Sequence, residues 1–319
     1  MGEKEFGMIG LGRMGGNLSR QAMNKGFHVV GYTKGEFPPD LIREGLVPIT
    51  SVDGFRDKLQ PPRIVIMYIP AGPAVDTVID RLGNVLGRGD VIVDGGNSYW
   101  GDSIERGKRL KEKGIYFIDL GTSGGVEGAI NGACFMAGGE DKAMELIEPI
   151  ILAMSVPNGY VHTGPVGSGH YTKLVHNGIE FGMLQAIGEG VDLLANSKFK
   201  LDTQAILNCW RHGSVIRSWL IDLLAQEYRE HDGMENIPSY VEDTGEVNWL
   251  VEDAIRMEVP CPVITLSVIE LFTSRDKQKL WARAIAMMRN GFGGHAFGPD
   301  KATAEERKHG KVGSEMCRK

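Results

Sequence analysis

A short stretch of the chain, residues 173–180, carries side chains that could perform acid–base chemistry from one side of a helix. The group consists of Lys173, His176, Asn177 and Glu180. Their spacing of i, i+3, i+4 and i+7 places them on one helical face. They combine a potential base, a potential acid and two hydrogen-bonding groups. A solvated Lys/Glu face is the simple alternative, but the intervening residues are mostly apolar or small, which favours a functional site.

A glycine-rich turn near the N-terminus predicts a dinucleotide-binding site. The apolar run 6–9 leads into a G-x-G-x-x-G pattern that consists of Gly10, Leu11, Gly12, Arg13, Met14 and Gly15. Helical periodicity follows the pattern, as this fold requires. Gly10 allows the tight turn, Gly12 lets a pyrophosphate approach the backbone, and Gly15 lets the helix pack on the strand. A plain glycine-rich turn is the alternative, and a second strand predicted at 28–32 disfavours it.

The end of that second strand indicates the preferred cofactor. NAD sites usually present Asp or Glu to the ribose hydroxyls at this point. The chain has Thr33 and Lys34 there instead. The missing carboxylate and the added cation favour the 2′-phosphate of NADP. NAD stays open, because Lys34 could be an ordinary surface lysine and Glu36 could act as a displaced acidic partner.

Alternating strands and helices predict an α/β fold with a Rossmann-type doubly wound sheet. Short apolar runs occur at 64–68, 91–93, 115–118 and 133–137, and charged helical stretches such as 101–113 separate them. This alternation is typical of a mostly parallel sheet. After Val161 long helical patterns dominate. We therefore expect a dinucleotide-binding domain over residues 1–165 and an all-α substrate-binding and oligomerisation domain over residues 166–319.

Three loops of small residues follow successive predicted strands. They are Pro70-Ala71-Gly72, Asp94 to Ser98, and Gly121 to Gly125. Any one of them could be a simple turn. Ligands of parallel sheets bind beyond the carboxyl ends of the strands. Three such loops together predict one cofactor and one substrate lying across them.

The composition narrows the possible partners. The chain has 319 residues, 42% of them hydrophobic, with a net charge of −6 and no basic stripe. A core of that size fits two domains, and the charge makes nucleic acid an unsuitable partner. We find no apolar run of membrane-spanning length and no charged-then-apolar signal segment. We therefore expect a cytoplasmic protein with a small-molecule substrate and no membrane partner.

The cysteines do not indicate a metal site or a disulfide framework. They are Cys134, Cys209, Cys261 and Cys317, and no pair has C-x-x-C spacing. We expect the first three to be small buried residues and Cys317 to be an exposed thiol near the C-terminus.

Taken together, the motifs resemble decarboxylating 6-phosphogluconate dehydrogenase. The matching segments are 10–15, 94–98, 123–129 and 169–180, and the length resembles the short form of that family. The resemblance implies oxidation of 6-phosphogluconate at C3 by NADP or NAD, loss of CO2 from the β-keto acid, and protonation of the enediol to ribulose 5-phosphate. This reaction belongs to the pentose phosphate pathway.

The resemblance also implies a role for each candidate residue. Lys173 would accept the C3 hydroxyl proton and later protonate the enediol oxygen, which requires a lysine that burial keeps neutral part of the time. Glu180 would protonate C1, and we expect its pKa to be raised in the substrate complex. Substrate hydroxyls would be held by His176 and Asn177. The substrate and nicotinamide pocket would be lined by Asn97, Ser123, Gly124 and Gly125.

Cations for the 6-phosphate come from the C-terminal half in this resemblance. Arg217 matches the phosphate-binding arginine of the family. An arginine suits this role, because its guanidinium presents a planar donor fork to phosphate. Arg289 and His295 match a pair that a neighbouring subunit supplies. We therefore expect a homodimer or homotetramer, in which apolar residues such as 263–271 are buried against the partner.

Two residues depart from the family pattern and keep alternatives open. Phe181 replaces a usual tyrosine, and Asn248 stands where lysine or arginine is usual. The substrate could be a related C6-substituted or unphosphorylated aldonate, unless Arg211 or His212 compensates. A 3-hydroxyisobutyrate-type β-hydroxyacid dehydrogenase and a non-catalytic dinucleotide-binding sensor are further alternatives. The base and acid on one helix disfavour both.

Overall fold

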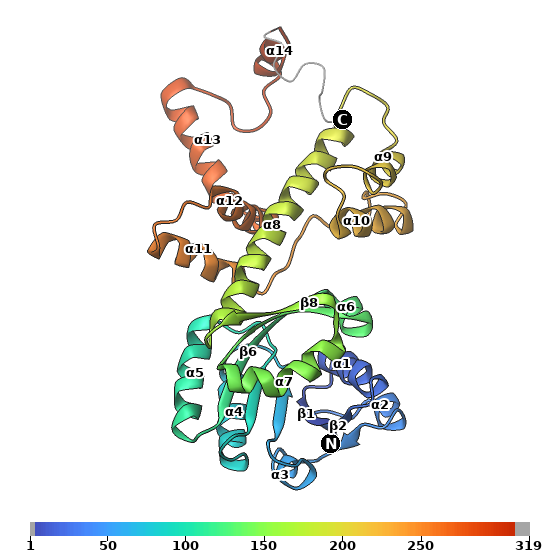
Figure 1. The fold of residues 1–319 in the computed structure, drawn as a ribbon. Coiled ribbons are helices and arrows are strands. Elements are labelled where there is room, and N and C mark those ends of the chain that lie inside the picture. Colours follow the sequence, from blue (N-terminus) through green and yellow to red (C-terminus); the bar gives the residue numbers. More distant parts are fainter. Residues whose placement is uncertain (1–3, 310–319) are drawn as a thin grey trace. The chain divides into compact units, whose positions relative to one another are not determined.

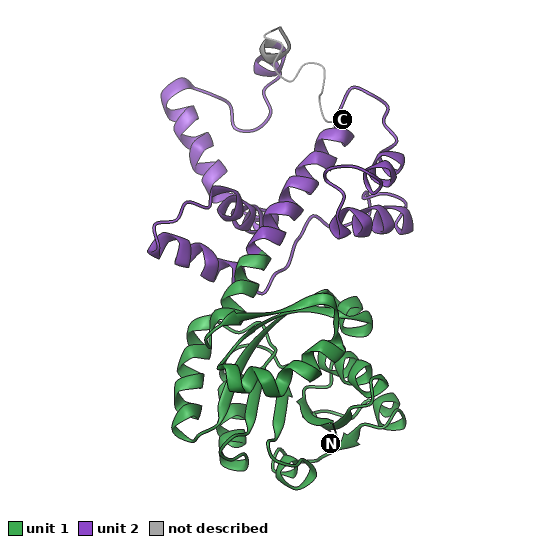
Figure 2. Cartoon of the chain, viewed as in Figure 1, with its two compact units in different colours: residues 1–177 green, residues 178–319 purple. Residues whose placement is uncertain are grey.

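The computed structural model describes residues 4–309, and the chain divides into two compact units (Figure 2). The division falls between Asn177 and Gly178, inside helix α8 (Ser168–Ala195). Within the described residues, none of the helices combines the length and apolarity that crossing a lipid bilayer would require.

The first unit is built on one eight-stranded sheet (Figure 1). Its strands are β1 (Glu5–Ile9), β2 (His28–Tyr32), β3 (Val47–Pro48), β4 (Ile64–Met67), β5 (Val91–Asp94), β6 (Tyr116–Ser123), β7 (Ala133–Gly138) and β8 (Ser155–Gly164). They lie in the order β3-β2-β1-β4-β5-β6-β7-β8, and every neighbouring pair is parallel except β6 and β7. The prediction of a mostly parallel, doubly wound sheet is confirmed.

Helices cover both faces of this sheet, and each face has its own buried cluster. One cluster joins the strands to α1 (Arg13–Asn24), α2 (Pro39–Arg43), α6 (Gly125–Asn131) and α7 (Asp141–Met154). The other joins them to α3 (Gly54–Lys58), α4 (Pro73–Val85) and α5 (Trp100–Glu112). All four residues of β4 and of β5 are buried, which explains why β4 is a continuous apolar run and β5 is apolar up to Asp94, rather than alternating.

The second unit is entirely helical in its described part, as predicted. After α8 come α9 (Thr203–Trp210), α10 (Trp219–Glu230), α11 (Glu246–Arg256), α12 (Pro262–Arg275), α13 (Leu280–Gly293) and α14 (Lys301–His309). A small buried cluster joins α8, α9 and α10 through Val191, Leu207 and Ala225. Near the start of the unit, a Cβ atom at Gly178 would collide with Leu250, so α8 and α11 pack closely.

Two local predictions were wrong. Residues 121–123 belong to β6 rather than to a loop, because antiparallel pairing with β7 continues to Ser123 opposite Cys134. Cys134 and Cys209 are exposed and Cys261 is only partly buried. Cys134 points away from its buried neighbours because side chains alternate along a strand. Cys317 lies outside the described residues.

The buried cluster that includes α3 lets us predict how a core substitution changes the free energy of unfolding. Phe55 is fully buried, so Phe55→Ala should lower the free energy of unfolding by about 3–5 kcal/mol through lost burial and a residual cavity. Denaturant unfolding followed by circular dichroism measures this change. Phe199→Ala, at a side chain that is 65% exposed, is the control and should change it little. An equal effect of both substitutions would contradict the assignment of Phe55 to the core.

Candidate active site

The glycine turn after β1 has the geometry that a dinucleotide requires. Gly10 has φ +87°, a conformation that residues with a side chain rarely adopt, and its amide donates to the carbonyl oxygen of Tyr32 at 2.9 Å. A Cβ atom at Gly15 would collide with the carbonyl oxygen of Gly10, whereas one at Gly12 would meet open space. Within the described chain, no side chain caps the first turn of α1. Its amides are therefore suited to an anion such as a pyrophosphate.

The remaining residues of the turn differ in exposure. Leu11 is a core residue, so only its backbone can face a ligand. Met14 is partly buried against the same core, and Arg13 is exposed. At the end of β2, Thr33 is half-buried and Lys34 is exposed. Lys34 is thus accessible to a ligand phosphate.

Two of the predicted loops lie beyond adjacent strands. Pro70, Ala71 and Gly72 connect β4 to α4, and Gly72 has φ +109° directly before the helix. Asn97 follows β5 and is exposed. The order of the sheet places β1, β4 and β5 side by side in parallel, so the glycine turn and both loops share one edge.

Asp94 determines the shape of the loop that carries Asn97. One carboxylate oxygen accepts the amide of Gly96 at 3.1 Å, and the other accepts the hydroxyl of Ser98 at 2.7 Å. Both bonds fold the loop back on Asp94. Asp94 is fully buried, and Asn97 is therefore presented outward on a fixed turn.

A buried arginine compensates the charge below this loop. Arg106 of α5 is only 1% exposed, and its guanidinium lies 3.5 Å from the carboxylate of Asp94 and 2.9 Å from that of Asp76 in α4. Hydrogen bonds from Arg106 lower the pKa of Asp76. The arginine therefore connects the start of α4 to the Asn97 loop. Our sequence reasoning missed Arg106, because a single arginine in a charged helical stretch resembles a surface residue.

Tyr68 provides a second connection between strand ends. Its hydroxyl lies 2.9 Å from that of Thr122, so it bridges the ends of β4 and β6. The ring passes over Gly95, where a Cβ atom would lie 2.6 Å from it. Burial of the hydroxyl raises the pKa of Tyr68, so the phenol stays neutral. Sequence reasoning missed this residue as well, since it extends an apolar run.

The small residues after β6 begin a short helix. Gly124 has φ +113° and caps α6, which starts at Gly125. Ser123 and Gly124 are half-buried, and Gly125 is exposed. The buried side chain of Gln21 in α1 donates to the carbonyl oxygen of Ala129 at 3.1 Å. This bond ties the predicted cofactor helix to the helix that follows the predicted substrate loop.

Four predicted site residues come together where α8 crosses the end of β6. Lys173 is 8% exposed, and its Nζ lies 3.3 Å from Nδ1 of His176. The other ring nitrogen, Nε2, lies 3.0 Å from the hydroxyl of Ser123. The side-chain oxygen of Asn177 lies 3.1 Å from Nδ1 of the same histidine. The cluster can exchange a proton and hold hydroxyl groups in one place.

The other predicted substrate residues lie in the second unit. Glu180 is half-buried on α8, seven residues after Lys173 in the same continuous helix. Arg217, in the segment before α10, is exposed. Arg289 of α13 and His295, which follows that helix, are also exposed.

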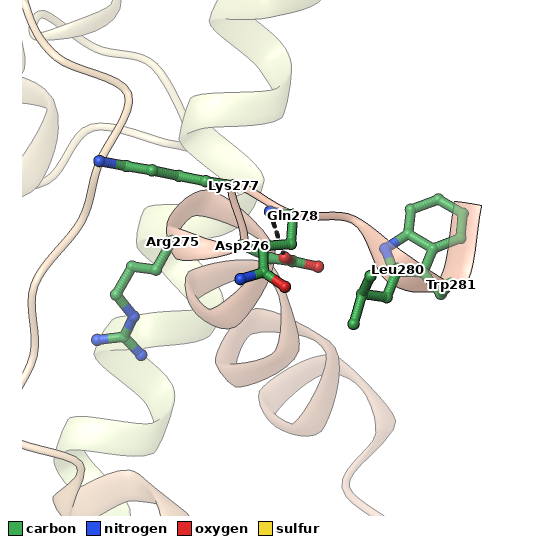
Figure 3. A pocket seen from close by; sticks show the side chains of 6 residues that line it. All are labelled: Arg275, Asp276, Lys277, Gln278, Leu280 and Trp281. Carbon is green, nitrogen blue, oxygen red and sulfur yellow. Dashed lines mark hydrogen bonds between the residues drawn. The ribbon is translucent and has the colours of Figure 1, made fainter. Parts of the chain in front are cut away.

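A pocket of about 490 Å³ lies in the second unit at the turn between α12 and α13 (Figure 3). It is lined by Arg275, Asp276, Lys277, Gln278, Leu280 and Trp281. None of these is a predicted site residue. Arg275 is already paired with Asp243 at 2.6 Å and with Glu242 at 3.2 Å. The predicted chemistry therefore does not coincide with this pocket.

Both parts of the chain match known family descriptions. Residues 5–164 match "NAD binding domain of 6-phosphogluconate dehydrogenase". Residues 169–279 and 195–311 match "6-phosphogluconate dehydrogenase, C-terminal domain". The two descriptions together cover most of the chain.

Individual proteins agree with these matches. The chain is 41% identical over 293 residues to the Bacillus subtilis protein YqeC, and the aligned region covers 92% of this chain and 98% of YqeC. It is 37% identical over 294 residues to the NAD-dependent decarboxylating 6-phosphogluconate dehydrogenase of Haloferax volcanii, covering 91% and 97%. Among solved structures, Plasmodium falciparum 6-phosphogluconate dehydrogenase, studied with NADP and with 6-phosphogluconate, has a TM-score of 0.78. It is 28% identical, with 96% of this chain and 68% of that chain covered.

The two glycines of the turn give a paired prediction. Gly12→Ala adds a methyl group in open space, so it should leave thermal unfolding unchanged and weaken dinucleotide binding by roughly tenfold or more. Gly15→Ala adds a methyl group against the backbone of Gly10 and should lower the free energy of unfolding by about 1–3 kcal/mol. Calorimetric binding and thermal unfolding separate the two effects. Unchanged dinucleotide affinity in Gly12→Ala would contradict the proposed approach of the pyrophosphate.

Proposed function

The chain belongs to the 6-phosphogluconate dehydrogenase family, and from this premise we propose that it oxidatively decarboxylates 6-phosphogluconate to ribulose 5-phosphate and CO2. The observation that carries the proposal is the buried Lys173 in contact with His176 at the end of β6. A cluster with a proton-exchanging amine and several hydroxyl-binding groups suits a sugar acid.

Lys173 is suited to moving a proton. An ammonium group is costly to bury, and only 8% of this residue is exposed. The neighbouring imidazole offers a second group that can take part in hydrogen bonding to the amine. We propose that Lys173 accepts the C3 hydroxyl proton and later returns a proton to the enediol oxygen. A bound NAD or NADP supplies the hydride acceptor.

The other side chains divide the remaining tasks. We propose that Glu180 protonates C1 after CO2 has left, and that His176 and Asn177 hold substrate hydroxyls. The fixed contact between His176 and Ser123 supports the second role, because it orients the imidazole. The outward presentation of Asn97 supports its place beside substrate and nicotinamide. Ser123, Gly124 and Gly125 complete the same wall.

We propose NADP as the preferred cofactor, with NAD as the alternative. The accessible Lys34 beside Thr33 at the end of β2 supports a 2′-phosphate. The relatives do not decide the choice, since the Haloferax enzyme is named NAD-dependent and the Plasmodium structure was determined with NADP. The pyrophosphate of either cofactor would be bound by the turn of residues 10–15, and the 70–72 loop would lie beside it.

The competing functions are less well supported. A 3-hydroxyisobutyrate-type dehydrogenase needs no acid to protonate C1, and both family matches of this chain are to 6-phosphogluconate dehydrogenase.

We propose that residues 1–165 bind the dinucleotide and that residues 166–319 bind substrate and form subunit contacts. A cytoplasmic location stays a prediction from composition.

The helices α12 and α13 support a homo-oligomer. Large apolar side chains are exposed along both, including Val263, Leu266, Trp281 and Phe292, and none of the residues of α13 is buried. Several large apolar side chains exposed together on one surface normally mark a contact with another protein. We propose that a second copy of this chain covers these helices and that Arg289 and His295 of each copy serve the substrate phosphate of the other, beside Arg217.

The reaction itself is tested by following NADP and NAD reduction with 6-phosphogluconate while CO2 is measured. We expect equal amounts of reduced cofactor and CO2, and a higher specificity constant with NADP. Lys173→Met should slow hydride transfer roughly 100- to 10,000-fold with unchanged dinucleotide affinity. Near-normal reduction by this variant would show that another group is the base. No turnover with 6-phosphogluconate, but turnover with another aldonate, would direct attention to Phe181 and Asn248.

Mixed oligomers test the shared site. Lys173→Met and Arg289→Ala should each be nearly inactive alone. If Arg289 acts on the neighbouring subunit, a mixed dimer contains one site with both residues intact, so co-expression should restore part of the activity. Two copies of the same variant, co-expressed with different tags, are the control. Inactive mixed dimers, or an active protein whose mass by light scattering is that of one 34.9 kDa chain, would contradict the proposal.

A further inference from the structure

A buried carboxylate lies directly beneath the start of the helix that carries Lys173. Asp119 is fully buried in the middle of β6, between Asp94 of β5 and Gly138 of β7. One carboxylate oxygen accepts the amide of Gly167, and the other accepts the amide of His170, each at 2.7 Å. Gly167 immediately precedes α8 and His170 lies in its first turn, where backbone amides have no partners inside the helix. Asp119 therefore binds the N-terminal end of α8 through two backbone amides.

The burial of this group has a cost that packing alone does not explain. Burial raises the pKa of Asp119, and the two amides and His170 act in the opposite direction. An apolar residue would fill a sheet position more cheaply. A buried carboxylate with both oxygens bonded instead specifies one position of its partners.

Alternate residues of β6 contact successive turns of α8. Asp119 bonds the first turn, and Ser123 contacts His176 at 3.0 Å. Between them, a Cβ atom at Gly121 would lie 2.5 Å from the Cβ of Lys173. Residues two apart on a strand point to the same face. The strand thus sets the position of the helix at three points, and the second lies directly against Lys173.

The first turn has little room to move. A Cβ atom at Gly169 would collide with the carbonyl oxygen of Asp119 and with the backbone of β7. Nδ1 of His170 lies 2.8 Å from the hydroxyl of Ser103 in α5. These contacts and both bonds of Asp119 together restrain the axial position of α8.

We propose that Asp119 is a positioning residue for the reaction, which sets the axial position of α8 and thereby places Lys173. This inference rests on the proposed function of Lys173. Displacement of a reacting group by about 1 Å can lower a rate roughly 100-fold. Loss of the Asp119 bonds should therefore slow catalysis without affecting the glycine turn, which binds the dinucleotide elsewhere on the sheet.

Asp119→Asn tests the proposal, because the amide replaces one acceptor oxygen by an NH2 group that faces a backbone N–H. We expect kcat to fall roughly 10- to 100-fold and dinucleotide affinity to stay within twofold. The kinetic isotope effect on hydride transfer should increase with substrate deuterated at C3, because a misplaced base makes chemistry slower than product release. A purely structural role would reduce the amount of active protein and leave the isotope effect unchanged.

Asp90→Asn is the matched control. Asp90 is 1% exposed and accepts the amides of Arg63 and Gly87 at 2.7 and 2.8 Å, but it precedes β5 and so lies at the opposite edge of the sheet. The Asp90→Asn variant should be less stable than the wild-type protein and should keep the wild-type kcat and isotope effect. Equal kinetic losses in both variants, or wild-type kinetics in Asp119→Asn, would overturn the proposal.

Two further measurements keep the test decisive. If Asp119→Asn does not fold, Gly121→Ala should shift Lys173 through the added methyl group and produce the same fall in kcat; unchanged kcat would contradict the strand's role. Hydrogen exchange of residues 167–177 should increase in Asp119→Asn and not in Asp90→Asn, and equal exchange would also overturn the proposal. This readout needs no substrate, so it distinguishes a failure of Asp119 from a failure of 6-phosphogluconate turnover in the wild-type protein.

Discussion

The direct contact between the backbones of β6, β7 and α8 is the constraint on which the first unit's candidate site depends. Glycine occupies the points of closest approach, at 121, 138 and 169, because a side chain at any of them would collide with its neighbours. At this distance a helix can bring a lysine onto the end of a strand. The same closeness excludes water, so the amides at the helix start need a protein acceptor, which is Asp119.

The site is assembled from chain segments that the sheet order makes neighbours. The ends of β1, β4, β5 and β6 share one edge, and side-chain bonds between them stiffen it. Arg106 connects α4 to the Asn97 loop, Tyr68 connects β4 to β6, and Gln21 connects α1 to α6. The segments proposed to bind cofactor and substrate are thus connected by these side chains, although they are far apart in sequence.

Much of this arrangement could be predicted from sequence because its signals are local. The glycine turn, the apolar strands and the helical spacing of Lys173 and His176 each depend on residues within a few positions of one another. The second half was predicted to be helical for the same reason. Even the neighbouring loops followed from a general property of parallel sheets.

The missed features depend on distant partners. Asp119 looks like an ordinary residue in an apolar run, and its acceptor role appears only when residues 48 and 51 positions later fold over it. Tyr68 meets Thr122 across 54 positions. The extension of β6 through Ser123 required knowledge of its antiparallel partner, and the same pairing decided which way Cys134 faces. A single sequence contains no local trace of such contacts.

The partners of Asp119 also bear on where the chain can be divided into fragments. A fragment ending at Gly164 would contain all eight strands, yet it would lack both amide donors of Asp119 and the helix turn that covers this carboxylate. A fragment ending at Asn177 keeps both donors and coincides with the end of the first compact unit. The proposed boundary between functions after residue 165 and the boundary between the two compact units are thus different places, and the first three turns of α8 belong to the same unit as the sheet.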